Sequence, residues 1–267
     1  MKPANLEEYK AIPFKERGQA LIEIAEEFNE KPNRKTAALL KNIAVLGGID
    51  SEQVAKAVVH VARNPKTWKL SRNILNAARG AAAPHLLGAL RDSNRRKFAM
   101  NLLKEMPDQA RTCAKQLHDP EISGYLIEVL ASKRMARSAA IECVNLLTYK
   151  AKKANAILVL TNPAVAPHSA MACAAALRYK KKKREAKNLL AHSNIAPYAP
   201  RHLVNALGDT RAEAAIEVLN NPQVRKYAEP FMIENADKGP FAPLVCELLR
   251  SWGIEPPPLR RNKTKTD

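Results

Sequence analysis

The sequence between Gly88 and Asp237 repeats itself every 30 residues, and this period divides it into five equal rows. The rows are 88–117, 118–147, 148–177, 178–207 and 208–237. Four of them end on leucine: Leu117, Leu147, Leu177 and Leu207. Four residues before each row ends stand Cys113, Cys143, Cys173, Leu203 and Ile233. Self-similarity at a fixed period of this length is typical of arrays in which each unit packs on its neighbours. The period therefore predicts a stack of repeats rather than one central core.

Each row contains two stripes of apolar residues at helical spacing. In the second row, Leu126, Val129 and Leu130 form the first stripe, and Ala140, Cys143, Val144 and Leu147 form the second. Steps of three and four residues indicate amphipathic helices rather than strands. A turn signal separates the stripes, for example Asn162-Pro163, because a residue before proline leaves the helical region. We expect an all-α fold in which each row is a pair of helices of about 11–13 residues.

The pattern resembles short HEAT-like repeats of the phycobilisome-lyase type. The features that carry the resemblance are the apolar ridge from Cys113 to Leu117, its equivalents one period apart, and the Asn-Pro turns. The resemblance covers about 150 of the 267 residues. It implies a right-handed α-solenoid of helix pairs, with period 30 over residues 88–237. Because such repeats carry unrelated functions, the resemblance concerns architecture only.

The flanking sequences predict the domain organisation. We expect an irregular lead-in at 1–17 and a single solenoid domain at 18–253, followed by a Pro-rich basic tail at 254–267. Within the domain, atypical or capping repeats occupy 18–87, and a C-terminal capping helix occupies 238–253. The first helix is expected over Gly18–Glu30, the second after Asn33, and the third after a cap at Asp50 or Ser51.

Charge is the strongest compositional signal, since the formal net charge is +18. Residues 1–60 hold 9 basic and 9 acidic residues, whereas residues 61–267 hold 35 and 17. The whole excess therefore belongs to the repeats and the tail. A basic excess of this size favours polyanionic partners.

The basic residues concentrate near the start of the rows. The third row begins with Tyr149, Lys150, Lys152 and Lys153, and the fourth begins with Tyr179 followed by Lys180–Lys183 and Arg184. The candidate nucleic-acid-binding set is Arg91, Arg95, Arg96, Lys97, Arg134, Arg137, Tyr149, Lys150, Lys152, Lys153, Tyr179, Lys180, Lys181, Lys182, Lys183, Arg184 and Arg211. Equal positions of stacked repeats form a ridge. We expect most of these cations along one edge, in the loops between repeats, with Arg134 and Arg137 at the opposite loops.

A basic ridge of this kind binds phosphates by Coulomb attraction and counterion release. We therefore expect a non-catalytic protein that binds a polyanion, with the nucleic acid backbone as first candidate and little sequence readout. DNA and RNA both remain open. The alternative is a protein–protein adaptor that binds an acidic partner. A lesser alternative is a HEAT-type alkylpurine DNA glycosylase, for which Trp68 with Arg63, Lys66, Lys69 and Arg72 would be the nearest groove.

Other chemistry has little support in the sequence. No phosphate-binding loop, nucleophile elbow or His-Glu-x-x-His motif is present, and we expect no cofactor, metal or small-molecule substrate. Three of the four cysteines share one repeat position and are expected to be buried, reduced thiols. The sequence shows no apolar signal core and no transmembrane run, which predicts a cytoplasmic protein that does not enter a membrane.

Overall fold

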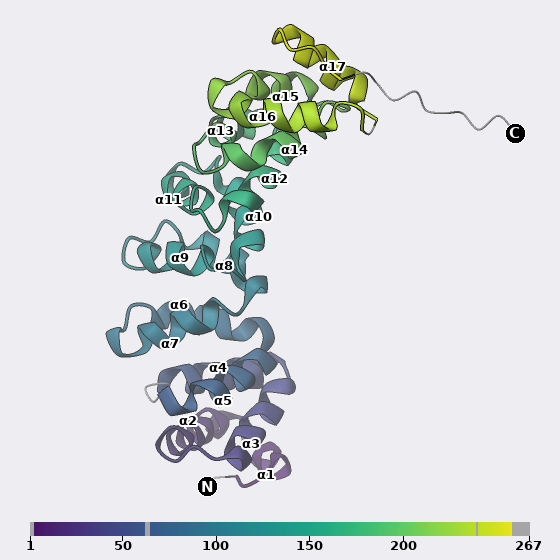
Figure 1. Ribbon diagram of the computed structural model, residues 1–267. Coiled ribbons are helices and arrows are strands. Elements are labelled where there is room, and N and C mark those ends of the chain that lie inside the picture. The colour runs from purple at the N-terminus through teal and green to yellow at the C-terminus, as the bar shows by residue number, and fades with distance from the viewer. Residues whose placement is uncertain (1–2, 62–64, 239, 258–267) are drawn as a thin grey trace, which may run out of the picture. The chain divides into compact units, whose positions relative to one another are not determined.

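The computed structural model describes residues 3–61, 65–238 and 240–257. These residues form 17 α-helices and four 3-10 helices, and no strand occurs among them. The all-α prediction is therefore confirmed (Figure 1). None of the described helices is both long and apolar enough to cross a membrane.

The chain divides into two compact units, with the boundary between Leu130 and Ala131. Unit 1 contains α1 (Leu6–Ala11), α2 (Phe14–Glu30), α3 (Arg34–Val45), α4 (Gly48–Val61), α5 (Trp68–Ala77), α6 (Ala82–Ala89), α7 (Ser93–Leu103), α8 (Ala110–Lys115) and α9 (Ser123–Leu130). Helices α2, α4, α6 and α8 pack on one another in succession and form one layer. On the other side, α3 packs on α5 and α7 packs on α9.

Capping residues and apolar stripes explain why unit 1 folds this way. Asn33 caps α3 by accepting a hydrogen bond from the backbone N–H of Thr36 at 2.8 Å, as the sequence predicts. Asp92 caps α7 through the N–H of Asn94 at 2.8 Å. The stripe of Leu21, Ile24 and Phe28 on α2 is buried, so the amphipathic pattern correctly identifies the core face.

Unit 2 contains α10 (Ala136–Leu146), α11 (Lys150–Leu160), α12 (Ala166–Ala176), α13 (Lys180–Leu190), α14 (Ala199–Val204), α15 (Ala212–Leu219), α16 (Pro222–Asn235) and α17 (Ala242–Ser251). One layer is the succession α10, α12, α14 and α16, and α13 packs on α15 in the other layer. Helices α11 and α13 begin 30 residues apart, as do α10 and α12 (Figure 1). The first helices of the third and fourth rows therefore match in length, as do the second helices of the second and third rows.

The fifth row departs from this register. Ile233, which is expected at the buried ridge position, is 40% exposed, and Met232 is buried in its place. The buried pair of α15 is likewise Val218 and Leu219 instead of Leu219 and the polar Asn220. Both changes are shifts of one residue, because Asn220 cannot occupy the apolar position that its alignment would give it.

Several expected boundaries are wrong. The segment 1–17, expected to be irregular, holds α1 and the first turn of α2. Helix α4 begins at Gly48 rather than after Asp50 or Ser51, and Asp50 accepts a hydrogen bond from the hydroxyl of Tyr9 at 2.7 Å. Helices α8, α9, α14 and α15 have 6, 8, 6 and 8 residues, shorter than expected. The basic part of the tail and Arg63 lie outside the described residues.

Candidate nucleic-acid interface

The lysine runs of the third and fourth rows form the first turns of two helices. The sequence predicts these residues in loops, but α11 begins at Lys150 and α13 begins at Lys180. Tyr149 and Tyr179 stand at the N-cap positions with extended backbones, at φ −102° and −99°, respectively. The two tyrosine residues are 59% and 52% exposed. Both tyrosines and the lysines after them therefore lie at corresponding ends of two helices.

These two helix ends are close together in space. The ammonium group of Lys153 on α11 donates a hydrogen bond to the carboxylate of Glu185 on α13 at 2.6 Å. Lys182 donates to the side-chain oxygen of Asn145, near the end of α10, at 2.7 Å. Its ammonium nitrogen also lies 5.1 Å from the centre of the Tyr179 ring, within cation–π range. The first turns of α11 and α13 thus line one surface at the end of α10.

We call this the lysine surface and define it by the residues of α11 and α13 that carry it. Its members are Tyr149, Lys150, Lys152, Lys153, Tyr179, Lys180, Lys181, Lys182, Lys183 and Arg184.

Charge on these two helices is strongly unbalanced. Together, α11 and α13 contain nine lysines and arginines and one acidic residue, Glu185. That carboxylate already contacts Lys153, and the Nε of Arg184 lies 3.8 Å from it. Lys150, Lys180 and Lys181 are exposed and make no ion pair within the described part of the chain. The lysine surface therefore presents several cations that no carboxylate neutralises.

The start of each helix also lacks the groups that normally stabilise it. Neither Tyr149 nor Tyr179 accepts a hydrogen bond through its side chain, and neither helix has an acidic residue in its first turn. The N-terminus of a helix carries a partial positive charge, so lysines there are unfavourable. Exposed first-turn N–H groups and like charges both favour an anion at this position.

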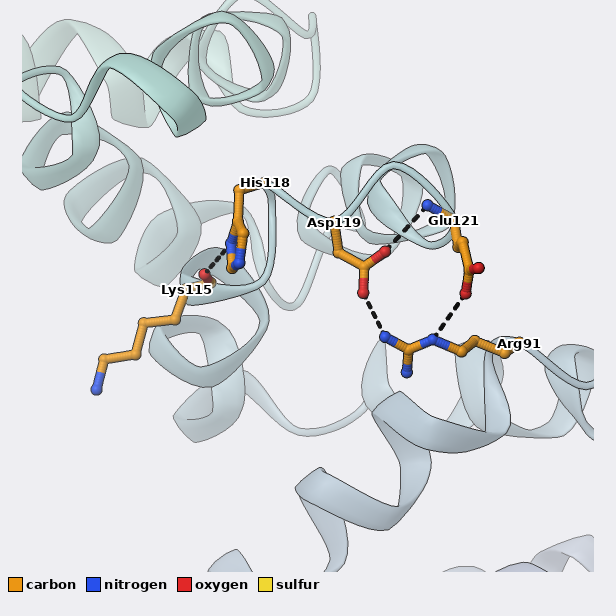
Figure 2. A network of polar contacts seen from close by, with 5 residues as sticks. All are labelled: Arg91, Lys115, His118, Asp119 and Glu121. Carbon is orange, nitrogen blue, oxygen red and sulfur yellow. Dashed lines mark hydrogen bonds and ion pairs between the residues drawn. The ribbon is translucent and has the colours of Figure 1, made fainter.

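The arginines of the first row behave differently. The guanidinium of Arg91 lies between two carboxylates, contacting Asp119 and donating a hydrogen bond from Nε to Glu121 at 3.0 Å (Figure 2). Asp119 is itself positioned by the backbone N–H of Glu121 at 3.0 Å. Figure 2 also shows His118 turned towards the carbonyl of Lys115, 3.0 Å away. Arg91 is therefore paired with two carboxylates within the protein although its side chain is 47% exposed, and its role as a phosphate contact stays a prediction.

Two neighbouring arginines are also engaged. Arg95 forms an ion pair with Asp92 at 2.7 Å. Arg96 donates to the carbonyl of Leu90 at 2.8 Å, and its guanidinium stacks 4.4 Å from the centre of the Tyr125 ring. Contacts with Asn94 and Arg95 lower the pKa of Asp92, so this carboxylate stays charged. Lys97 is exposed and makes no ion pair within the described residues.

The remaining predicted residues of unit 2 are Arg211, Arg134 and Arg137. Arg211 precedes α15 and forms an ion pair with Asp209 at 2.5 Å, and this contact lowers the pKa of Asp209 to about 2. Arg134 and Arg137 are exposed at the start of α10, the helix end opposite to the one next to Lys150.

Sequence reasoning missed two residues next to the lysine surface. Arg178 is exposed directly before Tyr179 and extends the basic run by one residue. Asn145 on α10 accepts a hydrogen bond from Lys182 on α13. Arg178 could have been included from its position in the run, whereas no local signal identifies Asn145.

No protein-family model matches the chain, and no curated protein matches it significantly.

Proposed function

We propose that this chain is a non-catalytic nucleic-acid-binding protein that holds the phosphate backbone on the lysine surface of α11 and α13. The proposal includes the HEAT-like, right-handed solenoid of period 30 predicted from the sequence, and a cytoplasmic location. Either DNA or RNA would satisfy it, because phosphates carry no base identity.

The observation that carries the proposal is the combination of charge and helix polarity. The lysine surface carries eight cations, and α11 and α13 supply one carboxylate, Glu185; several of the cations lie at helix N-termini without a side-chain cap. Each feature is unfavourable in the unbound chain. Places where a sequence breaks local stability rules on a surface are commonly functional sites. Bound phosphates would make favourable contacts both with the clustered lysines and with the helix N-termini.

The distribution of the cations supports a backbone rather than a single anion. Lys150 and Lys180 begin two different helices whose first turns line one surface, so the two helix ends would contact separate phosphates. Tyr149 and Tyr179 present exposed rings beside both ends. They offer additional contact area to sugars or bases without base-specific hydrogen bonds.

Neutralising three exposed lysines tests the proposal. The variant Lys150→Gln, Lys180→Gln, Lys181→Gln should bind fluorescent duplex DNA or single-stranded RNA about tenfold or more weakly at roughly 100 mM salt, since each lost phosphate contact removes a counterion-release contribution. Fluorescence anisotropy measures this directly. None of the three side chains has an ion-pair partner within the described residues, so the fold should be retained.

The matched control removes the same charge elsewhere. Lys35, Lys41 and Lys56 are exposed on α3 and α4, and changing all three to Gln lowers the net charge equally. We expect nearly wild-type affinity from this control. Equal losses in both variants would mean that the overall charge, not the lysine surface, determines binding. Failure of the wild-type protein to bind either nucleic acid would favour an acidic protein partner.

A further inference from the structure

A second feature of the molecule lies in unit 1, apart from the lysine surface. A cleft of about 450 Å³ opens between the first turn of α5 and the end of α7. Its walls include Trp68 and Phe98, and its charged groups are Lys69, Arg72, Lys104 and Glu105. The cleft thus combines an aromatic wall with a predominance of positive charge.

Phe98 holds the aromatic wall in place. The rings of Trp68 and Phe98 have centres 5.6 Å apart and planes inclined at 52°, a favourable tilted arrangement. Phe98 is 2% exposed, whereas Trp68 is partly exposed. The indole N–H is buried and has no acceptor within the described residues. Apolar atoms of the indole therefore line the cleft, because its polar atom is buried.

The cations of the cleft differ in whether a carboxylate lies within hydrogen-bond distance of them. Lys104 donates a hydrogen bond to Glu128 at 2.6 Å. Arg72 is 41% exposed, and its nearest carboxylate oxygen, on Glu105, is 3.9 Å away, beyond hydrogen-bond distance. Lys69 is exposed. Arg72 makes no hydrogen bond within the described residues, so its donors are available to an anion.

From this arrangement we propose that the cleft binds a nucleotide, with the base against Trp68 and the phosphate on Arg72 and Lys69. An aromatic wall alone would suit any apolar ring, and cations alone would suit any anion. The two side by side fit a planar ring joined to a phosphate, as in a free nucleotide or the terminal nucleotide of a strand. This proposal is independent of the lysine surface.

The chain has two tryptophans, Trp68 and Trp252, which makes a direct test possible. In a Trp252→Phe background, Trp68 is the single indole emitter. Its fluorescence should change saturably as adenosine 5′-monophosphate is added. Adenosine alone and inorganic phosphate alone should each bind at least about tenfold more weakly, because each lacks half of the contacts. Trp252 donates to the exposed Asn220, so its removal leaves no buried group unpaired.

Two arginine variants separate the cleft from general charge. Arg72→Gln should weaken binding of adenosine 5′-monophosphate about tenfold, the effect of a lost charge-assisted hydrogen bond. Arg111→Gln removes an equal charge from an exposed position on α8 and should have no effect.

The aromatic wall is tested with Trp68→Leu, whose binding is followed by calorimetry. This variant should bind at least about fivefold more weakly through lost stacking. The Lys150→Gln, Lys180→Gln, Lys181→Gln variant should bind the nucleotide normally.

Nuclear magnetic resonance provides a readout that needs no variant of the cleft. The wild-type protein has two indole N–H signals, assigned with the Trp252→Phe variant, and the nucleotide should shift the Trp68 signal alone. No shift and no fluorescence change up to about 10 mM nucleotide would overturn the proposal. So would equal binding by the Arg72→Gln variant. Competition by a 5′-phosphorylated oligonucleotide would identify a strand end as the ligand, and its absence would identify a free nucleotide.

Discussion

Cys113, Cys143 and Cys173 occupy equivalent places in successive helix pairs, and each is completely buried. Burial raises the pKa of each of these thiols to about 12, because the thiolate loses its hydration. At pH 8 only about one thiol in ten thousand is ionised at that pKa. These residues act as small apolar side chains in the core, as the sequence predicts.

This environment predicts chemical inertness. In the folded protein, iodoacetamide at pH 8 should label these three cysteines about a thousandfold more slowly than free cysteine. Peptide mass spectrometry measures the labelling of each site, and unfolding in denaturant provides the positive control. Native labelling at the rate of free cysteine would contradict the burial that the structure shows.

At the residue scale, side chains with a fixed place in the repeat could be predicted, but ion pairs could not. Arg91 meets Asp119 and Glu121, about one repeat further along the chain, and Lys153 meets Glu185. Such contacts depend on the angle at which one helix packs on the next, and composition carries no information about that angle. The sequence therefore identified where the cations are but not which of them remain unneutralised.

At the scale of the helix, α11 and α13 begin without a side-chain cap, as do α10, α12 and α15, whereas α3 and α7 begin with a capping asparagine or aspartate. In α13 the first four residues are all lysines. Favourable first turns contain acidic residues, so this arrangement lowers the stability of the helix. We infer that the lysines of α13 lower its stability because they serve as a binding surface. Such a compromise between stability and binding is common at functional sites.

The compromise predicts opposite effects on stability and binding. Lys180→Glu with Lys181→Glu should raise the free energy of unfolding by about 0.5–2 kcal/mol, because both changes place favourable charges at the helix N-terminus. The same variant should bind nucleic acid more weakly. Thermal unfolding followed by circular dichroism and fluorescence anisotropy measure the two effects.

The matched control for this prediction lies at a helix C-terminus. Lys115 is exposed in the last turn of α8, where the macrodipole favours a cation. Lys115→Glu should therefore lower stability. If the double variant Lys180→Glu, Lys181→Glu also lowers the free energy of unfolding, then the helix macrodipole is not the reason why the lysines of α13 destabilise the fold.

Helix existence was easier to predict than helix position. The apolar stripes correctly identified the helices of the third and fourth rows, whose buried residues recur every 30 positions. They placed the lysine runs in loops because lysine carries no apolar periodicity. In the fifth row the buried positions are shifted by one residue. The sequence shows Asn220 as a break in the apolar pattern, but it does not show which neighbouring residue is buried instead.

At the scale of the whole molecule, the charge excess lies outside the first 60 residues, which are neutral overall. Acidic residues of this part of the chain pair with particular cations, among them Arg91, Arg95, Lys187 and Arg211, and leave other cations without a carboxylate partner. The lysine surface is where cations gather without such partners. The net charge therefore indicates the sign of the partner, and the structure indicates the region that meets it.

The most direct test of this account is the salt dependence of nucleic acid binding. Affinity for fluorescent duplex DNA, single-stranded RNA and heparin would be measured from about 50 to 300 mM salt, for the wild-type protein and the Lys150→Gln, Lys180→Gln, Lys181→Gln variant. We predict tighter binding to a nucleic acid than to heparin. The logarithmic salt slope for duplex DNA should be about 2 to 3 units shallower in the variant, because three phosphate contacts are lost. Binding no tighter than to heparin, or identical slopes in both proteins, would contradict a phosphate-binding lysine surface.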